Sequence, residues 1–178
     1  MGKREISDIS QIIIDDLYKK EDGITPKALE IKDLNPHEYL IIKSEKHSVL
    51  AYYNPELKLV QKINKPSAYG INPRNAEQCF SLHALMNTDI SLVTLAGKAG
   101  TGKTLLALAS ALDIRKHYNQ IYLARPIVPL SNKDLGFLPG DIEKKMDPYM
   151  QPLYDNLNVI QNCYNKAEKE YKTITKML

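Results

Sequence analysis

One run of eight residues constrains this chain more than any other feature. Residues 97–104 match the pattern Gly-x-x-x-x-Gly-Lys-Ser/Thr at every fixed position. Glycines at these places let the backbone wrap closely around phosphate oxygens, and the amides and the start of the next helix supply positive potential. The motif predicts a phosphate-binding loop (P-loop) formed by Gly97, Lys98, Ala99, Gly100, Thr101, Gly102, Lys103 and Thr104.

The last two motif residues have the most specific predicted chemistry. Lys103 is expected to reach the β- and γ-phosphates of a nucleoside triphosphate, and the Thr104 hydroxyl is expected to ligate magnesium. These two residues are the predicted catalytic groups, and Thr104 is the predicted metal ligand. The expected cofactors are ATP and Mg²⁺.

The residues around the motif predict the fold class. Ser91–Ala96 is a short apolar strand candidate, Lys103–Tyr118 has helical spacing, and Gln120–Ala124 is a second strand candidate. Strand, glycine loop, helix and strand form a βαβ unit, which implies a parallel sheet with flanking helices. The predicted class is therefore α/β.

The N-terminal third reads differently. Apolar residues at helical spacing predict a helix over Asp8–Lys20, followed by short β-prone runs at Tyr39–Lys43, Ser48–Tyr53 and Leu57–Ile63. Residues 1–66 are therefore predicted to be a small antiparallel β-rich connector module with an N-terminal helix, and residues 67–178 the P-loop core.

Two amides upstream of the motif are candidates for recognising the base. Asn72-Pro73 predicts the start of a helix over Pro73–Met86, which carries Asn75 and Gln78 on nearly the same face. An amide offers a donor and an acceptor, as the N6 and N7 edge of adenine requires, so the pair favours ATP over GTP. The alternative is two polar residues on a solvated helix face.

Downstream of the second strand candidate lies a long loop over Arg125–Gly140. Arg125 is placed to contact phosphate or a nucleic-acid backbone, or alternatively to pair with an acid in the loop. Gly136–Asp141 reads as an architectural turn into a helix that Pro148 and Pro152 are expected to bend or split.

Composition sets broader limits. A chain of 178 residues with a net charge of +3 allows one domain with a small appendage, and the charge is too weak to imply nucleic acid. Cys79 and Cys163 belong to no metal-spaced cluster and are expected to be ordinary thiols. With no apolar run of membrane length and no secretory signal, the expected compartment is the cytoplasm, with no membrane partner.

The acid that a P-loop hydrolase needs at the end of a neighbouring strand is not visible after the motif. Asp15 and Asp16 end an apolar run, but they precede the motif, and a helix explains them better. The chain is therefore expected to bind ATP without efficient hydrolysis.

Four ordered motifs resemble the PhoH-like P-loop ATPases, and most of all the C-terminal ATPase part of proteins that join a PIN nuclease domain to a PhoH domain. The resemblance covers about residues 50–157. The motifs are Tyr69–Gln78, the P-loop, Ala124–Pro129, and Gly136–Asp141 with Pro148 and Pro152.

The resemblance implies a RecA-like core, ATP hydrolysis, single-stranded RNA as partner and assembly into hexamers. It also implies an adenine contact for Gln78 and a place near polymer and phosphates for Arg125. An upstream PIN domain, the Walker B acids, a sensor segment and an arginine finger are missing from the sequence, and residues 163–178 do not read like the family. The chain is thus expected to be a truncated piece of a helicase-like ATPase.

Two other functions remain open. A P-loop kinase of a small metabolite would use the same phosphate loop, but no acidic or arginine-rich cluster for an acceptor stands out. A nucleotide-binding module that serves assembly without hydrolysis would also fit the sequence.

Overall fold

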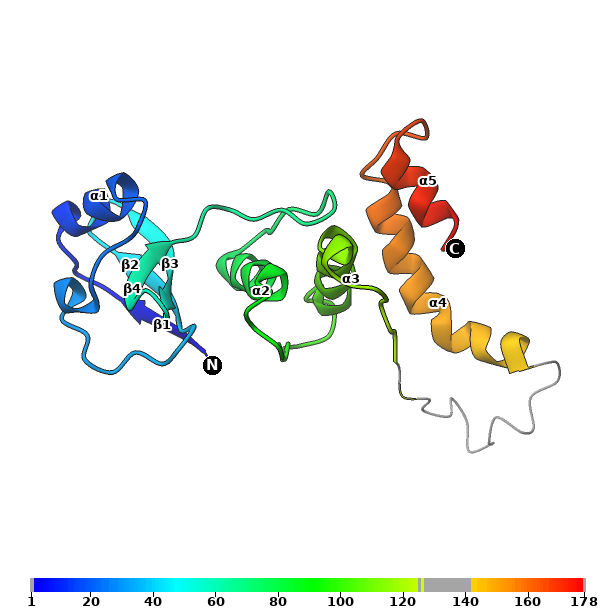
Figure 1. The fold of residues 1–178 in the computed structure, drawn as a ribbon, viewed down its shortest axis with the longest axis horizontal. Coiled ribbons are helices and arrows are strands. Elements are labelled where there is room, and N and C mark those ends of the chain that lie inside the picture. Colours follow the sequence, from blue (N-terminus) through cyan, green and yellow to red (C-terminus); the bar gives the residue numbers. More distant parts are fainter. Residues whose placement is uncertain (1, 125, 127–141, 178) are drawn as a thin grey trace. The chain divides into compact units, whose positions relative to one another are not determined.

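The computed structural model describes residues 2–124, 126 and 142–177. The chain divides into two compact units, which are described separately (Figure 1). The first unit comprises residues 1–66 and 73–83, and the second comprises residues 67–72 and 84–178. The first change of unit falls beside the predicted boundary at residue 66, while residues 73–83 return to the first unit.

A four-stranded sheet forms the centre of the first unit. Its strands lie in the order β1 (Lys3–Ile6), β2 (Tyr39–Lys43), β3 (Ser48–Asn54) and β4 (Leu59–Lys62). The pairs β2–β3 and β3–β4 are antiparallel, as predicted, whereas β1 pairs in parallel with β2.

The sequence did not predict β1 because its four residues include three charged ones. The strand has no apolar pattern. It pairs with β2, and two of its side chains form ion pairs, Arg4 with Glu38 and Glu5 with Lys43. The module is thus a mixed sheet rather than a purely antiparallel one.

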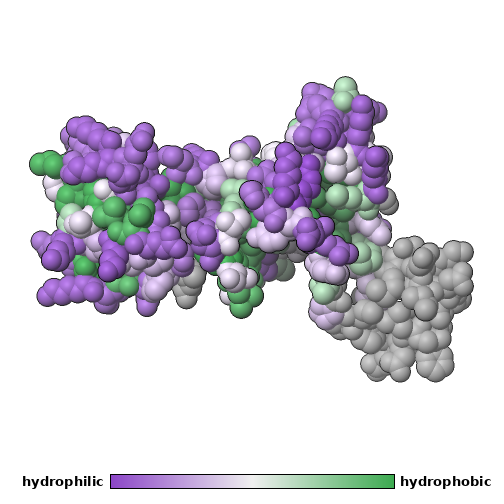
Figure 2. Space-filling model, viewed as in Figure 1, coloured by the Kyte–Doolittle hydropathy of each residue, from purple (hydrophilic) through white to green (hydrophobic). Residues whose placement is uncertain are grey.

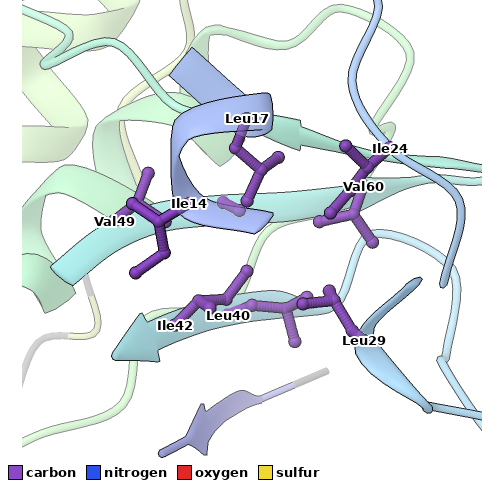
Figure 3. Packing of buried hydrophobic residues seen from close by; sticks show 9 residues of the cluster. Ile14, Leu17, Ile24, Leu29, Leu40, Ile42, Val49 and Val60 are labelled. Atoms are coloured by element: carbon purple, nitrogen blue, oxygen red, sulfur yellow. The ribbon is translucent and has the colours of Figure 1, made fainter. Parts of the chain in front are cut away.

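Helix α1 (Gln11–Lys19) covers one face of this sheet. It begins at Gln11, not at the predicted Asp8, because the Ser10 hydroxyl caps it by accepting a hydrogen bond from the Ile12 amide. Figure 3 shows Ile14 and Leu17 lying over the apolar residues of the strands. The buried core of this face is Ile14, Leu17, Ile24, Leu29, Leu40, Ile42, Val49, Ala51 and Val60.

Helix α2 (Ala76–Met86) packs against the opposite face of the sheet. Successive side chains of a strand point to opposite faces, so this face carries the strand residues that alternate with those of the α1 core. The Tyr39 ring stacks on Phe80 with 4.8 Å between ring centroids, and the Tyr52 ring lies 4.4 Å from that of His83. The helix starts at Ala76 and not at the predicted Pro73, because Asn75 supplies its cap.

The second unit is helical in the residues that the structure describes. Helix α3 (Lys103–Asp113) packs against α4 (Ile142–Gln161), and α4 packs against α5 (Lys169–Thr175). The buried apolar residues include Leu106, Ala109, Leu112, Leu153, Leu157, Ile160 and Ile174.

Two predicted helix limits are corrected here. Helix α3 ends at Asp113, and a 3-10 turn over Arg115–His117 follows in place of the predicted continuation to Tyr118. Helix α4 runs without a break through positions 148 and 152, so of the two expected effects of the prolines, a bend or a split, the split does not occur. Each proline removes one backbone donor but leaves the rest of a 20-residue ladder in place.

The predicted parallel sheet around the P-loop is not formed in the part of the chain that the structure describes. Ser91–Ala96 and Gln120–Ala124 pair neither with each other nor with another described strand. A strand exists only through hydrogen bonds to a neighbour, so an apolar run without one stays irregular. The molecule is a mixed α/β protein, and its one described sheet lies in the first unit.

Apolar side chains remain on the surface of both units, as green areas among purple ones (Figure 2). Exposed large apolar or aromatic side chains of the second unit include those of Leu92, Tyr118, Tyr122 and Leu123, which belong to or adjoin the unpaired segments. Among the described helices, none has the length and apolar character that crossing a membrane would require.

Candidate functional site: the phosphate loop

The loop before α3 adopts a conformation that depends on glycine. Gly100 has φ 77° and Gly102 has φ 84°, both in the left-handed region that other residues rarely adopt. These two residues turn the chain from an exposed segment into the helix. The motif's glycines therefore shape the loop as the sequence predicts.

The start of α3 has no side-chain cap. Gly102 is the N-cap residue and makes no side-chain cap, because glycine has no side chain that could accept from the first amides, while Leu106 N donates to the Gly102 carbonyl at 2.9 Å. Uncapped amides at a helix start, together with the helix dipole, attract anions. The first turn carries no acidic residue that would oppose an anion.

Lys103 lies folded over the loop. Its ammonium donates to the carbonyl oxygens of Gly97 at 2.9 Å and Lys98 at 2.7 Å, and to Thr101 Oγ1 at 3.3 Å. Thr101 Oγ1 in turn donates to the Lys98 carbonyl at 2.9 Å. The positive charge is thus held at the centre of the loop, where a bound phosphate group would compete with the carbonyls for it.

Thr104 follows in the first turn of α3 with an exposed side chain. Its hydroxyl can be a magnesium ligand, because oxygen is the donor that this ion prefers. Lys98, Ala99, Gly100 and Thr101 are exposed as well, so the predicted phosphate contacts form one accessible surface. The buried side chains of Leu106 and Ala109 hold the helix beneath it.

The two candidate base contacts form a helix cap. Asn75 Oδ1 accepts a hydrogen bond from the Gln78 amide at 2.9 Å, and Gln78 Oε1 accepts from the Arg74 amide at 2.8 Å. This arrangement resembles a capping box, in which side chains at both ends of the first turn satisfy unpaired backbone donors. Asn75 therefore has a structural role that the sequence interpretation missed, although Asn72-Pro73 already pointed to a helix start nearby.

The other candidates belong to the other unit or fall outside the described residues. Gln78 and Asn75 belong to the first unit and the P-loop to the second, each described by itself. Arg125 and the turn Gly136–Asp141 fall outside the described residues. Asp15 and Asp16 lie on α1, where they accept hydrogen bonds from Gln11 and Lys20.

A turn that sequence reasoning did not assign closes the far end of α3. Asp113 Oδ1 accepts a hydrogen bond from the Tyr69 amide at 3.0 Å, and the Arg115 guanidinium lies 5.0 Å from the centre of the Tyr69 ring. Gly70, at φ 81°, lies so close to Cys163 that a β-carbon would come within 2.7 Å of the cysteine Cβ. Gly70 was the available signal, since glycine adopts the positive φ of a tight turn at no steric cost.

The site thus defines a P-loop nucleotide-binding protein. The sequence profile described as "PhoH-like protein" matches residues 70–176, more than half of the chain. The chain belongs to the PhoH-like family. The match reaches residue 176, so the expectation that residues 163–178 depart from the family is wrong.

Individual relatives support the same family assignment. Protein PhoH2 of Bacillus subtilis (strain 168) is 36% identical over 168 residues, covering 90% of this chain and 38% of that protein. Protein PhoH2 of Thermobispora bispora is 33% identical over 153 residues, covering 84% of this chain and 35% of that protein. Protein PhoH of Escherichia coli (strain K12) is 41% identical over 86 residues, covering 47% of this chain and 23% of that protein.

The chain therefore spans about 38% of the length of the first of these relatives, and less of the other two. No solved structure matches the chain.

Proposed function

We propose that this chain is the ATP-binding part of an ATPase that acts on single-stranded RNA in a helicase-like manner. The observation that carries the proposal is the uncapped start of α3 beside the folded ammonium of Lys103. The Lys103 ammonium and the helix start without a side-chain cap lie on one loop, and together they fit the phosphates of a nucleotide.

Magnesium and adenine complete the proposed ligand. The exposed Thr104 hydroxyl is the proposed magnesium ligand, and magnesium would neutralise charge on the phosphates when bound. Gln78 is the proposed adenine contact, because a side-chain amide offers both the donor and the acceptor that the N6 and N7 edge of adenine requires. Arg125 is proposed to contact phosphate or RNA.

A RecA-like arrangement of the P-loop unit is supported by one of the unpaired segments. Ile121 and Leu123 line a cavity of about 300 Å³ together with side chains of α3 and α4, whereas Tyr122 between them is 83% exposed. Alternation of this kind is the pattern of a strand that rests on helices. We propose that Ser91–Ala96 and Gln120–Ala124 are strands of a parallel sheet in a longer protein.

The remaining features of the proposal rest on the family resemblance. They are an upstream PIN domain, a hexameric assembly and hydrolysis that needs an acid and an arginine finger absent from this sequence. Arginine fingers contribute on the order of 10³- to 10⁵-fold to rate. The chain as given is therefore proposed to bind ATP and to turn it over very slowly.

Turnover with and without RNA tests this function. ATP hydrolysis is measured on a full-length PhoH2 relative and on the present chain. In each protein a variant with alanine in place of the P-loop lysine, which is Lys103 in this chain, controls for contaminating activity. The proposal expects RNA-stimulated turnover that depends on Lys103 in the long protein and almost none in the short chain. Transfer of phosphate to a small metabolite instead of water would identify a kinase and contradict the proposal.

A further inference from the structure

Positive charge is concentrated at the C-terminal end of the second unit. Residues 162–177 hold four lysines, at positions 166, 169, 172 and 176, and two glutamates, at positions 168 and 170. The whole chain has a net charge of only +3, so most of its positive excess lies in this short segment. Basic residues clustered on one face attract a polyanion even where the net charge of a chain is small.

The packing of α5 leaves three of these lysines on one outward face. Ile174 is fully buried, and α5 packs against α4 (Figure 1). Lys169 and Lys172 lie in the helix, and Lys176 caps its end with right-handed helical dihedral angles. At about 100° per residue, these lysines lie within about 60° of one another and about 140° to 160° from Ile174. All three are exposed, and together they form the α5 lysine stripe.

The two acids of the segment do not neutralise the stripe. Glu168 Oε1 accepts a hydrogen bond from the Asn165 amide at 2.9 Å. Glu170 is half-buried near the paired rings of Tyr69 and Tyr164, where burial, the neighbouring Tyr69 and the Glu170 charge raise the pKa of Tyr164 to about 12. None of the ion pairs between described residues includes a lysine of the stripe. Its ammonium groups therefore face solvent with their charge uncompensated by these acids.

The length of the α5 lysine stripe suits a row of phosphates. Lys169 and Lys176 are seven positions apart, so at about 1.5 Å per residue the stripe is about 10 Å long. Successive phosphates of one strand lie about 3.4 Å apart along a double helix, so this length spans about three of them. Each of the three lysines can therefore meet a separate phosphate.

The surroundings of the stripe favour a nucleic acid over a membrane or an acidic protein. A helix that lies on a bilayer inserts apolar side chains beside its basic ones. Helix α5 instead keeps its one aliphatic residue, Ile174, buried in the protein, and the exposed Met177 lies beyond the end of the helix. A row of charges at regular spacing matches a polymer with a repeating charge, whereas the carboxylates of a protein surface have no such repeat.

We propose that the α5 lysine stripe is a docking surface for the phosphate backbone of a single nucleic-acid strand. Ammonium groups contact phosphates without reading the base, so binding should not depend on sequence, and RNA and DNA should bind alike. The choice of a single strand rests on the RNA-directed function proposed above. The surface uses no residue of the phosphate loop, so its test is independent of ATP binding.

Fluorescence anisotropy of labelled strands tests the proposal on the whole chain without ATP. Oligouridylate and oligothymidylate of about 12 nucleotides are titrated with protein at several salt concentrations between about 0.05 and 0.2 M. Lys169→Gln, Lys172→Gln and Lys176→Gln are made singly and together. The matched control removes the same charge from three exposed lysines of the first unit, through Lys27→Gln, Lys32→Gln and Lys46→Gln combined. Thermal unfolding verifies that each variant is folded.

The expected effect appears in the salt dependence of binding. Each phosphate contact of a single strand adds about 0.7 to the slope of log affinity against log salt concentration. Each single substitution should therefore lower this slope by about 0.7 and weaken binding about fivefold at about 0.1 M salt. The triple stripe variant should lower the slope by about 2 and weaken binding about 100-fold. The control triple variant should bind like the parent chain.

Four results would overturn the proposal. They are no saturable binding of either strand to the parent chain, an unchanged salt slope in the triple stripe variant, an equal loss in the control triple variant, and tighter binding to vesicles of phosphatidylserine and phosphatidylcholine than to the strands. Mg-ATP is titrated separately into the parent and the triple stripe variant, and equal affinities are expected. A parent chain that binds strands but not ATP would refute the nucleotide site and leave this surface standing.

Discussion

At the scale of single residues, Asn75 and Gln78 show how one side chain can carry two readings. Their spacing fits an adenine contact, and it also fits a helix cap, because both use an amide at the first helical turn. The structure has the hydrogen bonds of the cap. The sequence could predict that both amides lie near the start of a helix. It could not predict the two cap hydrogen bonds, because these depend on the residue at which α2 begins.

Substitution at Asn75 separates the two roles. Asn75→Asp keeps the oxygen that accepts from the Gln78 amide, whereas Asn75→Ala removes it. We expect Asn75→Ala to lose about 1 kcal/mol of stability and Asn75→Asp to lose little, as measured by urea unfolding. Equal stability of parent and Asn75→Ala would contradict the cap.

His83 makes the stability of the first unit depend on pH. Its pKa falls from 6.5 to about 4 on folding, chiefly through burial, so the unfolded chain binds the proton more readily. The free energy of unfolding therefore carries its full contribution from neutral His83 above pH 6.5. It falls by roughly 2 to 3 kcal/mol as the pH drops toward 4.

In the parent chain the Tyr39 hydroxyl lies 3.1 Å from His83 Nδ1. The variant His83→Gln keeps a group able to form a hydrogen bond with this hydroxyl, but glutamine does not titrate. Unfolding free energies between pH 7.5 and 4 should fall more steeply for the parent chain than for His83→Gln. The exposed His47→Gln serves as the control and should follow the parent. Parallel curves for the parent and His83→Gln would refute the assignment.

At the scale of elements, the turn at Tyr69 and Gly70 links the ends of α3 and α4. Gly70→Ala should destabilise the second unit by about 1 to 3 kcal/mol, because φ 81° strains alanine and its Cβ would meet Cys163. Gly2→Ala, with nothing within 4 Å, is the control. Urea unfolding followed by tyrosine fluorescence measures both, and a Gly70→Ala chain as stable as Gly2→Ala would contradict this packing.

Elements whose signal lies in neighbouring residues were predicted well, and elements that depend on distant partners were not. The short runs at residues 39–43 and 48–53 became β2 and β3 nearly as bounded, since β-prone residues and the turns between them are local signals. The charged β1 was missed because its partner β2 lies more than thirty positions away. Ser91–Ala96 carries the local signal of a strand but has no partner among the described residues.

At the scale of the whole molecule, the unpaired segments link the structure to its longer relatives. If Ser91–Ala96 and Gln120–Ala124 are strands of a sheet completed elsewhere, their amides should exchange hydrogen quickly in this chain and slowly in a full-length relative. Amides of β3 should be protected in both proteins and provide the internal control. Fast exchange at 92–95 and 121–124 in the long protein would contradict the proposed RecA-like sheet.

The P-loop itself was the most predictable part of the molecule. Its glycines and the helix start follow from eight residues, and Gly100 and Gly102 take the left-handed conformations that glycine favours. The bonds from Lys103 to the carbonyls of Gly97 and Lys98 were not predictable, because they depend on the loop's full geometry.

Calorimetric titration of Mg-ATP into the parent chain and into Lys103→Ala tests whether the loop before α3 is the nucleotide site. Lys116→Ala, which removes an exposed lysine of the same unit outside the loop, controls for the loss of one charge. We expect saturable binding to the parent and to Lys116→Ala, and no detectable binding to Lys103→Ala. Equal ATP affinity in all three proteins would show that the loop before α3 is not the nucleotide site.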